Sequence, residues 1–349
     1  MAVYIQSANQ ISAQQPLSDE WFDNPVYYDE KRVRTIDPDF SGYLSPLLSR
    51  RMCTLLKRAV VMSRLTLQEA GIEMPDAIIS GTGLGCIDNT EKFLISIMEN
   101  DEKFLQPTYF MQSTHNIISS TIAIDLKCHG YNNSFVHRGV SFENALLDAM
   151  MQFEQKRIRT ALVGGYDELT DNYYTLFGKM GTWNFVPGES PQKKCFAGET
   201  SVNMLLGTEK NEHTLCEVND VELMYRPTHG QMKAALDAML ARTGCDWSDI
   251  DAVLTGVNTD TENDTVYSDM ISNVLGGCPV MQYKHIFGES FSSSAMAVYV
   301  AMTCLRKGRI PSFLLSDNVS EISGVKHILI YNHYKNKSHS LIFLSSCLD

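Results

Sequence analysis

One stretch of the sequence reads Gly130-Tyr-Asn-Asn-Ser-Phe-Val-His-Arg-Gly139-Val-Ser-Phe-Glu-Asn-Ala145. It is followed by a predicted helix to Gln155 and then by Thr160-Ala-Leu-Val-Gly-Gly-Tyr-Asp-Glu168. On its own, Gly139 is an ordinary turn glycine that supplies a backbone conformation with positive φ. A cysteine at a turn that opens a helix would be reactive, because the helix dipole lowers the pKa of a thiol there. The sequence places a glycine, which has no nucleophile, at such a turn.

The chain contains an internal repeat. The first copy consists of Ala70-Gly71 followed by residues 76–82, and the second of Thr243-Gly244 followed by residues 251–257. Each copy is typical of a turn and a buried strand. Upstream of each turn, apolar residues at three-and-four spacing predict a helix. These helices are predicted over residues 52–69 and 230–242.

The two copies continue in the same order. A proline-led segment, Pro107–Gln112 or Pro279–Gln282, precedes a helix of small residues that begins near Ser119 or near Ser292. Each half then ends in a β-branched strand, over residues 160–164 and 327–331. This alternation predicts an α/β fold with right-handed crossover connections.

Composition limits the classes of function. The 349 residues are 44% hydrophobic and 20% charged, which is typical of a globular protein, and the net charge of −12 disfavours a nucleic-acid partner. Nine cysteines occur singly, which predicts reduced thiols in the cytoplasm and neither a zinc site nor a disulfide framework. The sequence shows no secretion signal and no run of about 18 apolar residues. No membrane span is therefore predicted.

A glycine-rich segment, Gly81-Thr-Gly-Leu-Gly85, follows a predicted strand and is similar to a phosphate-binding loop. A dinucleotide motif would need a sixth-position glycine, and that position is Cys86. We therefore predict no nucleotide cofactor.

Residues 130–168 resemble the β-ketoacyl synthases of fatty-acid and polyketide assembly. In that family a Gly-Pro-Asn strand leads to a Thr-Ala-Cys turn, a long helix and a strand that ends in Gly-Gly-x-(Asp)-Glu, and the family's Phe-x-x-Gly-Glu-Gly strand is matched by Phe196–Thr200. The resemblance implies a thiolase-like, five-layer αβαβα fold from two similar halves, here residues 1–210 and 211–349. It also implies that Gly139 occupies the position of the catalytic cysteine.

The resemblance implies three further catalytic elements, and each is altered. No histidine lies between His229 and His285, so the first family histidine corresponds to Thr255 or Gly256. In Lys284-His-Ile-Phe-Gly-Glu289 the lysine and glycine of the family motif remain, but Glu289 replaces the second histidine. A carboxylate there would repel a malonyl group and cannot donate as imidazolium does. The family's C-terminal glycine-rich loop corresponds to residues 331–340, which contain no glycine.

Because these family positions are altered, we predict that the chain has no catalytic residues. In this respect it is similar to the chain-length-factor-like subunits of type II polyketide and aryl-polyene systems. Such subunits lack the nucleophile, pair with an active ketosynthase and help to shape its acyl tunnel. The resemblance therefore implies a heterodimer with an active ketosynthase and contact with an acyl carrier protein, with a homodimer as an alternative assembly. The partner surface is expected around Phe135, Phe142 and residues 106–114.

Two alternatives remain open from the residues. The first is an acyltransferase or decarboxylase with a rearranged site that uses His137, Ser141 or an unassigned cysteine, with Lys284 as a further residue of this possible site. The second is a binding module for an acyl chain or carrier protein, which would use the basic clusters Lys156-Arg157-Arg159 and Arg306-Lys307-Arg309.

Overall fold

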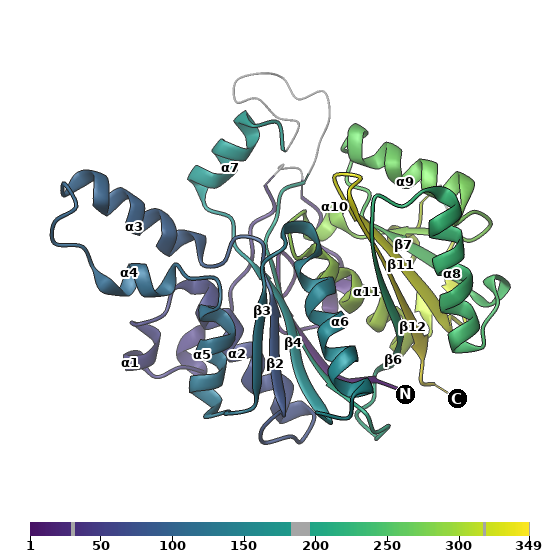
Figure 1. The fold of residues 1–349 in the computed structure, drawn as a ribbon, viewed down its shortest axis with the longest axis horizontal. Helices are drawn as coiled ribbons and strands as arrows, with labels where there is room; N and C mark the ends of the chain where they lie inside the picture. The colour runs from purple at the N-terminus through teal and green to yellow at the C-terminus, as the bar shows by residue number, and fades with distance from the viewer. Residues whose placement is uncertain (29–31, 183–195, 317–318, 349) are drawn as a thin grey trace.

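A ten-stranded sheet runs through the structure, a computed structural model that describes residues 1–28, 32–182, 196–316 and 319–348 (Figure 1). The strand order is β3-β2-β4-β5-β1-β6-β12-β11-β7-β8, and β9 and β10 form a separate pair. The strands are β1 (Tyr4–Ile11), β2 (Ala77–Gly81), β3 (Tyr131–Phe135), β4 (Thr160–Asp167), β5 (Thr200–Gly207), β6 (Cys216–Tyr225), β7 (Ala252–Thr255), β8 (Val280–Gln282), β9 (Arg309–Ile310), β10 (Ile322–Ser323), β11 (His327–Tyr334) and β12 (Ser338–Ser346).

The two halves of the sheet have the same topology. In each half the three outer strands are parallel, β3-β2-β4 and β8-β7-β11, and the two inner strands are antiparallel to their neighbours. The halves meet where β1 pairs with β6, Tyr4 opposite Glu217 and Ile5 opposite Cys216. The division at residue 210 falls in the connection between β5 and β6, and its assignment as a domain boundary stays a prediction.

The helices complete five layers. Helices α6 (Ser141–Glu154) and α11 (Ser293–Lys307) lie between the halves and contact strands of both. Helices α2 (Thr54–Glu69) and α5 (Ile117–Leu126) pack on the outer face of the first half, and α8 (His229–Thr243) and α9 (Thr261–Asn273) on that of the second. The five-layer fold is therefore confirmed. The other helices are α1 (Pro46–Ser49), α3 (Ile87–Glu99), α4 (Pro107–Gln112), α7 (Asp171–Lys179) and α10 (Lys284–Phe287).

The central layer depends on small residues and on one apolar stripe. Helix α6 buries Phe142, Ala145, Leu146 and Ala149, spaced as one helical face. Helix α11 is buried at every residue from Ser293 to Leu305. A Cβ on Gly165 would lie 2.6 Å from the Cβ of Ala295, so the second glycine of the Gly-Gly-x-Asp-Glu segment lets β4 approach α11.

Two sequence expectations are wrong. The proline-led segments are not equivalent, because Pro107–Gln112 forms α4 whereas Pro279–Gln282 contains β8. By position in the sheet the counterpart of β8 is β3, and that of α11 is α6. Phe142, expected at a partner surface, is completely buried between the sheet halves, because it lies on the inward face of α6.

Helices α3 and α4 form an arm that projects from the body of the molecule (Figure 1). The rings of Phe93 and Phe110, 5.3 Å apart, join the two helices. Among the described residues, no helix combines the length and apolar character needed to cross a membrane.

Candidate functional site

Gly139 lies in a 3-10 turn, η3 (Arg138–Val140), directly before α6. A Cβ added to Gly139 would lie 2.5 Å from Cδ2, 2.8 Å from Cγ and 2.9 Å from Cβ of Tyr334. These distances are far shorter than the optimal separation of two carbon atoms, about 3.5–4.0 Å. Tyr334 therefore fills the space that a side chain at position 139 would need.

Tyr334 reaches this position from the hairpin between β11 and β12. Lys335 and Asn336 have positive φ angles of 51° and 48°, and the Lys337 N–H closes the turn by donating to the Tyr334 carbonyl at 3.0 Å. Tyr334 opposes Ser338 in the register, and its ring centroid lies 6.0 Å from that of Phe291. The segment without glycines, residues 331–340, forms this hairpin.

A cavity of about 450 Å³ lies beside Gly139, within the volume range of small-molecule sites. Thr255 does not line it, because this side chain is buried and its hydroxyl donates to the Met281 carbonyl at 3.1 Å. Four of the residues singled out from the sequence do line it: Gly139, Gly256, Lys284 and Glu289.

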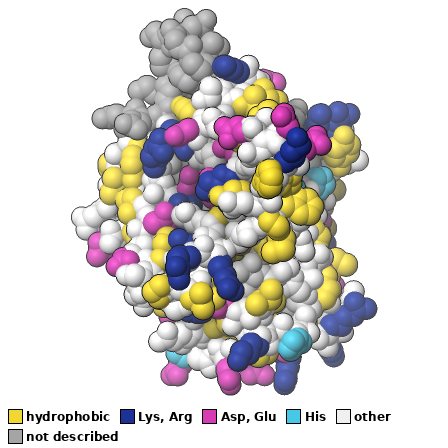
Figure 2. Space-filling model, turned by 90° about the vertical axis from the view of Figure 1, so that its left-hand side faces the viewer, with side chains coloured by type: hydrophobic (Ala, Val, Ile, Leu, Met, Phe, Trp, Pro, Cys, Tyr) yellow, Lys and Arg dark blue, Asp and Glu magenta, His cyan; other side chains and the backbone are white. Residues whose placement is uncertain are grey.

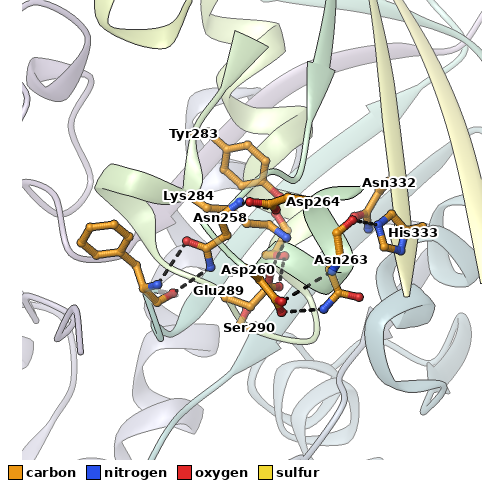
Figure 3. A network of polar contacts seen from close by, with 12 residues as sticks. Asn258, Asp260, Asn263, Asp264, Tyr283, Lys284, Glu289, Ser290, Asn332 and His333 are labelled. Atoms are coloured by element: carbon orange, nitrogen blue, oxygen red, sulfur yellow. Dashed lines mark hydrogen bonds and ion pairs between the residues drawn. The ribbon is translucent and has the colours of Figure 1, made fainter. Parts of the chain in front are cut away.

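Lys284 and Glu289 form an ion pair in the cavity wall (Figure 3). The Lys284 side chain is 4% exposed and that of Glu289 29%. Burial acts to lower the pKa of Lys284, but the Glu289 carboxylate and two nearby tyrosines outweigh it, and the pKa is raised. The other carboxylate oxygen of Glu289 accepts a hydrogen bond of 3.1 Å from Ser293 Oγ. Lys284 and Ser293 therefore hold Glu289 in place on the cavity wall.

Behind this pair lies a polar chain that the sequence did not reveal. Tyr267 Oη donates to Asn332 Oδ1 at 2.8 Å, and Asn332 Nδ2 donates to Glu143 Oε1 at 2.9 Å. Burial raises the pKa of Glu143, which favours the neutral carboxyl. A Cβ on Gly256 would lie 2.2 Å from Tyr267 Oη and 2.8 Å from Lys284 Nζ. A sequence signal existed only for Glu143, a carboxylate on the apolar face of a helix.

His333 is a second wall residue that sequence reasoning missed. Its Nε2 lies 3.0 Å from the Asn263 carbonyl, and its Nδ1 accepts the Asn336 amide at 3.3 Å. Burial lowers its pKa to about 3, so the imidazole is neutral at physiological pH. Because both nitrogens are engaged, His333 is not available as a general base.

His137 and Ser141 do not form a base–nucleophile pair. The Ser141 hydroxyl is buried, accepts the His137 backbone N–H at 2.8 Å and donates to the Arg138 carbonyl at 2.7 Å. The His137 residue itself is exposed. Ser141 therefore holds the η3 turn in place. Within the described ranges, no group of three or more His, Cys, Asp or Glu side chains is placed to hold a metal ion.

The glycine-rich loop after β2 is closed by Asp167. Its Oδ1 accepts the backbone N–H groups of Gly83 at 2.9 Å and Leu84 at 3.0 Å, and the hydroxyl of Thr82 at 3.2 Å. These are the donors that a phosphate would use. The similarity to a phosphate-binding loop therefore reflects a loop that binds a carboxylate of its own chain.

The neighbouring carboxyl, Glu168, makes stability depend on pH. Burial raises its pKa to about 8, whereas a glutamate in an unfolded chain titrates at about 4.3. The folded state therefore binds this proton more tightly, and the resulting stabilisation is complete below about pH 4 and is lost as the pH rises through about 8. We expect the urea midpoint to fall from about pH 5 to about pH 8.5, and to fall less in Glu168→Gln. Equal slopes in the two proteins would contradict this assignment.

Gly139→Cys tests whether Tyr334 fills the space beside position 139. The added side chain meets the ring, so we expect a loss of about 1–3 kcal/mol in the free energy of unfolding and slow alkylation by iodoacetamide. In Gly139→Cys combined with Tyr334→Ala, the introduced thiol should alkylate faster and part of the stability should return. Equally fast alkylation without the second change would show that the position is open.

Comparison of the sequence with models of protein families identifies the family of this chain. Residues 20–239 match the family model described as "Beta-ketoacyl synthase, N-terminal domain". This match covers more than half of the chain, and the fold is a thiolase-like pair of α/β halves. The chain belongs to the β-ketoacyl synthase family. Its sequence matches no curated protein.

Three solved structures share the fold over nearly their whole length. The ishigamide ketosynthase/chain length factor has a TM-score of 0.81 at 15% identity, covering 99% of both chains. A type II polyketide synthase acyl carrier protein in complex with its ketosynthase has a TM-score of 0.79 at 14% sequence identity, and the match covers 100% of this chain and 99% of the other. A ketosynthase in complex with its chain length factor from Xenorhabdus doucetiae has a TM-score of 0.79 at 14% sequence identity, and the match covers 99% of this chain and 98% of the other. At these identities the likeness concerns the fold.

Proposed function

We propose that the chain is a non-catalytic, chain-length-factor-like subunit that pairs with an active β-ketoacyl synthase in the cytoplasm. It would shape the acyl tunnel in fatty-acid or polyketide biosynthesis, aryl polyenes included. The observation that carries the proposal is the nucleophile position, where Gly139 offers no side chain and Tyr334 fills the space. The positions that correspond to the two histidines of the family, Thr255 or Gly256 and Glu289, also carry no imidazole. The chain is therefore expected to be inactive as a ketosynthase on its own.

The proposed partners follow from the structures that share the fold. Two of them pair a ketosynthase with a chain length factor, and the third contains an acyl carrier protein. An active ketosynthase is therefore the proposed partner subunit, and an acyl carrier protein the second partner.

The arm and the edge of the sheet form the surface that we assign to the ketosynthase (Figure 2). Strand β3 is an edge strand, and edge strands present unpaired backbone groups that favour pairing with another chain. Hydrophobic side chains gather between Lys and Arg residues on this side of the molecule. The exposed apolar residues of α3, α4, the loop between them and α5 are Leu94, Ile95, Met98, Phe104, Phe110, Met111 and Ile124. Apolar side chains in such numbers are typical of the centre of a protein interface.

Phe110→Asp combined with Met111→Asp tests this surface, because both side chains are more than half exposed on α4. Placing two charges in an interface centre should cost more than about 2 kcal/mol, a loss of affinity of roughly 30-fold or more. Binding to the ketosynthase encoded in the neighbouring genes would be measured by co-purification and calorimetry.

Met74→Asp is the matched control, since Met74 is also exposed but precedes β2, away from the arm. It should bind as the parent does. A stable monomer that binds no ketosynthase would contradict the proposed function. Equal binding by the arm variant would contradict the proposed surface alone.

The alternative functions have less support. Arg306 is paired with Asp19, and Arg309 with Asp23 and Glu321, so this basic cluster already has partners in the chain. The other cluster, at residues 156–159, precedes β4, whereas the cavity lies beyond the carboxyl ends of the parallel strands. A carrier protein bound there would lie about the length of an eight-residue strand, roughly 25 Å, from the cavity.

A further inference from the structure

Ser293 is a hydroxyl group in the cavity wall that the proposed function does not use. It is the first residue of α11, a 15-residue helix, and lines the cavity. Its Oγ donates to Glu289 Oε1 at 3.1 Å, within the reach that a general base requires. The N-terminal end of a helix favours negative charge, including the charge that develops on an attacking oxygen. Ser141, by contrast, is bonded to backbone on both sides.

Glu289 is held in position for this contact. Its second oxygen pairs with Lys284, whose pKa is raised, so the amine stays protonated. An ammonium group has three N–H donors, and the ion pair with Glu289 does not need all of them. Lys284 can therefore also donate to an oxygen atom that gains negative charge during a reaction beside Glu289. Nucleophile, proton acceptor and cation therefore lie in one wall of the same cavity.

We propose that Ser293 accepts an acyl group from a thioester, with Glu289 as general base and Lys284 as positioning residue. Ser293 Oγ attacks the carbonyl carbon and its proton passes to Glu289. The carbon–sulfur bond then breaks, and the departing thiolate takes the proton, which leaves an ester on Ser293 and a free thiol. Attack by water through the same steps releases a carboxylic acid and restores the serine.

The cavity also selects the acyl group. Its volume of about 450 Å³ fits a short chain, and three carboxylates in its wall besides Glu289 disfavour a malonyl group. They are Asp260, Glu262 and Asp264. The substrate class is therefore a short, uncharged acyl thioester.

The test uses the full chain, incubated with acetyl-, butyryl- or malonyl-coenzyme A and analysed by intact mass and peptide mapping. We expect a hydroxylamine-sensitive ester on the peptide with Ser293 from the first two thioesters and little from malonyl-coenzyme A. Ser293→Ala should abolish the ester, and Glu289→Gln should slow its formation by about 100-fold or more. Ser290→Ala is the matched control, because the Ser290 hydroxyl bonds Thr200 at 2.6 Å instead of a carboxylate.

The outcomes separate this proposal from ketosynthase pairing. No ester at Ser293 in the parent chain, or the same adduct in Ser293→Ala, overturns it. Glu289→Gln also removes the ion-pair partner of Lys284, so the thermal unfolding of this variant is measured as well. Ser293→Ala keeps the ion pair, and the result with this variant decides whether the proposal holds. Binding to the ketosynthase is measured on the same preparation, so that failure of one proposal is distinguishable from failure of the other.

Discussion

Lys284→Met is expected to lower the free energy of unfolding by about 3 kcal/mol. The lysine side chain is 4% exposed, and its removal leaves the carboxylate of Glu289 without its cation. The expected loss lies at the lower end of the range for buried pairs, because the Glu289 side chain keeps 29% exposure and some contact with water. Urea unfolding followed by circular dichroism measures the change.

The double variant Lys284→Met with Glu289→Gln is the control for this interpretation. It removes both charges, and neutral replacement of a buried pair costs far less than removal of one partner. It should therefore recover most of the lost stability. A single variant within about 1 kcal/mol of the parent would mean that the pair contributes little to the fold.

Gly81→Ala is expected to destabilise the protein by about 3 kcal/mol. The new methyl group would lie 2.6 Å from the backbone N and Cα of Phe142 and from the carbonyl carbon of Ser141. These are backbone atoms at the start of α6, and they cannot move aside as the end of a side chain can. Thermal unfolding and urea midpoints measure the loss.

Gly42→Ala is the matched control, because a Cβ on Gly42 meets no atom within 4 Å. Its effect should stay within about 0.5 kcal/mol. A comparable loss in both variants would show that the close packing of β2 on α6 is not the cause.

Much of the fold could be predicted from the sequence, since hydrophobic spacing marks the repeated units. The helix predicted over 52–69 is observed as Thr54–Glu69, and the one predicted over 230–242 as His229–Thr243. Local pattern did not distinguish the two proline-led segments, because pairing with β7 decides that residues 280–282 form a strand. Phe142 was misplaced for a similar reason, since an apolar residue on a helix fits a core as well as an interface.

The candidate site could be predicted only in part. Motif spacing located Gly139, Lys284 and Glu289, which line one cavity. The contact of Tyr334 with Gly139 depends on a hairpin 195 positions further along the chain, from 139 to 334. The contact of Asn332 with Glu143 likewise joins residues 189 positions apart. Contacts at such separations leave no local pattern in a single sequence.

The central place of β1 has a consequence for biosynthesis. Its neighbours, β5 and β6, comprise residues 200–207 and 216–225. From the end of β1 at residue 11 to the end of β6 at residue 225 the chain adds 214 residues. At about 5–20 residues per second the ribosome needs roughly 10–45 s to make them. Strand β1 therefore waits with both edges unpaired until β5 has been made, and with one edge unpaired until β6 follows. A chaperone that binds extended segments has that interval in which to act.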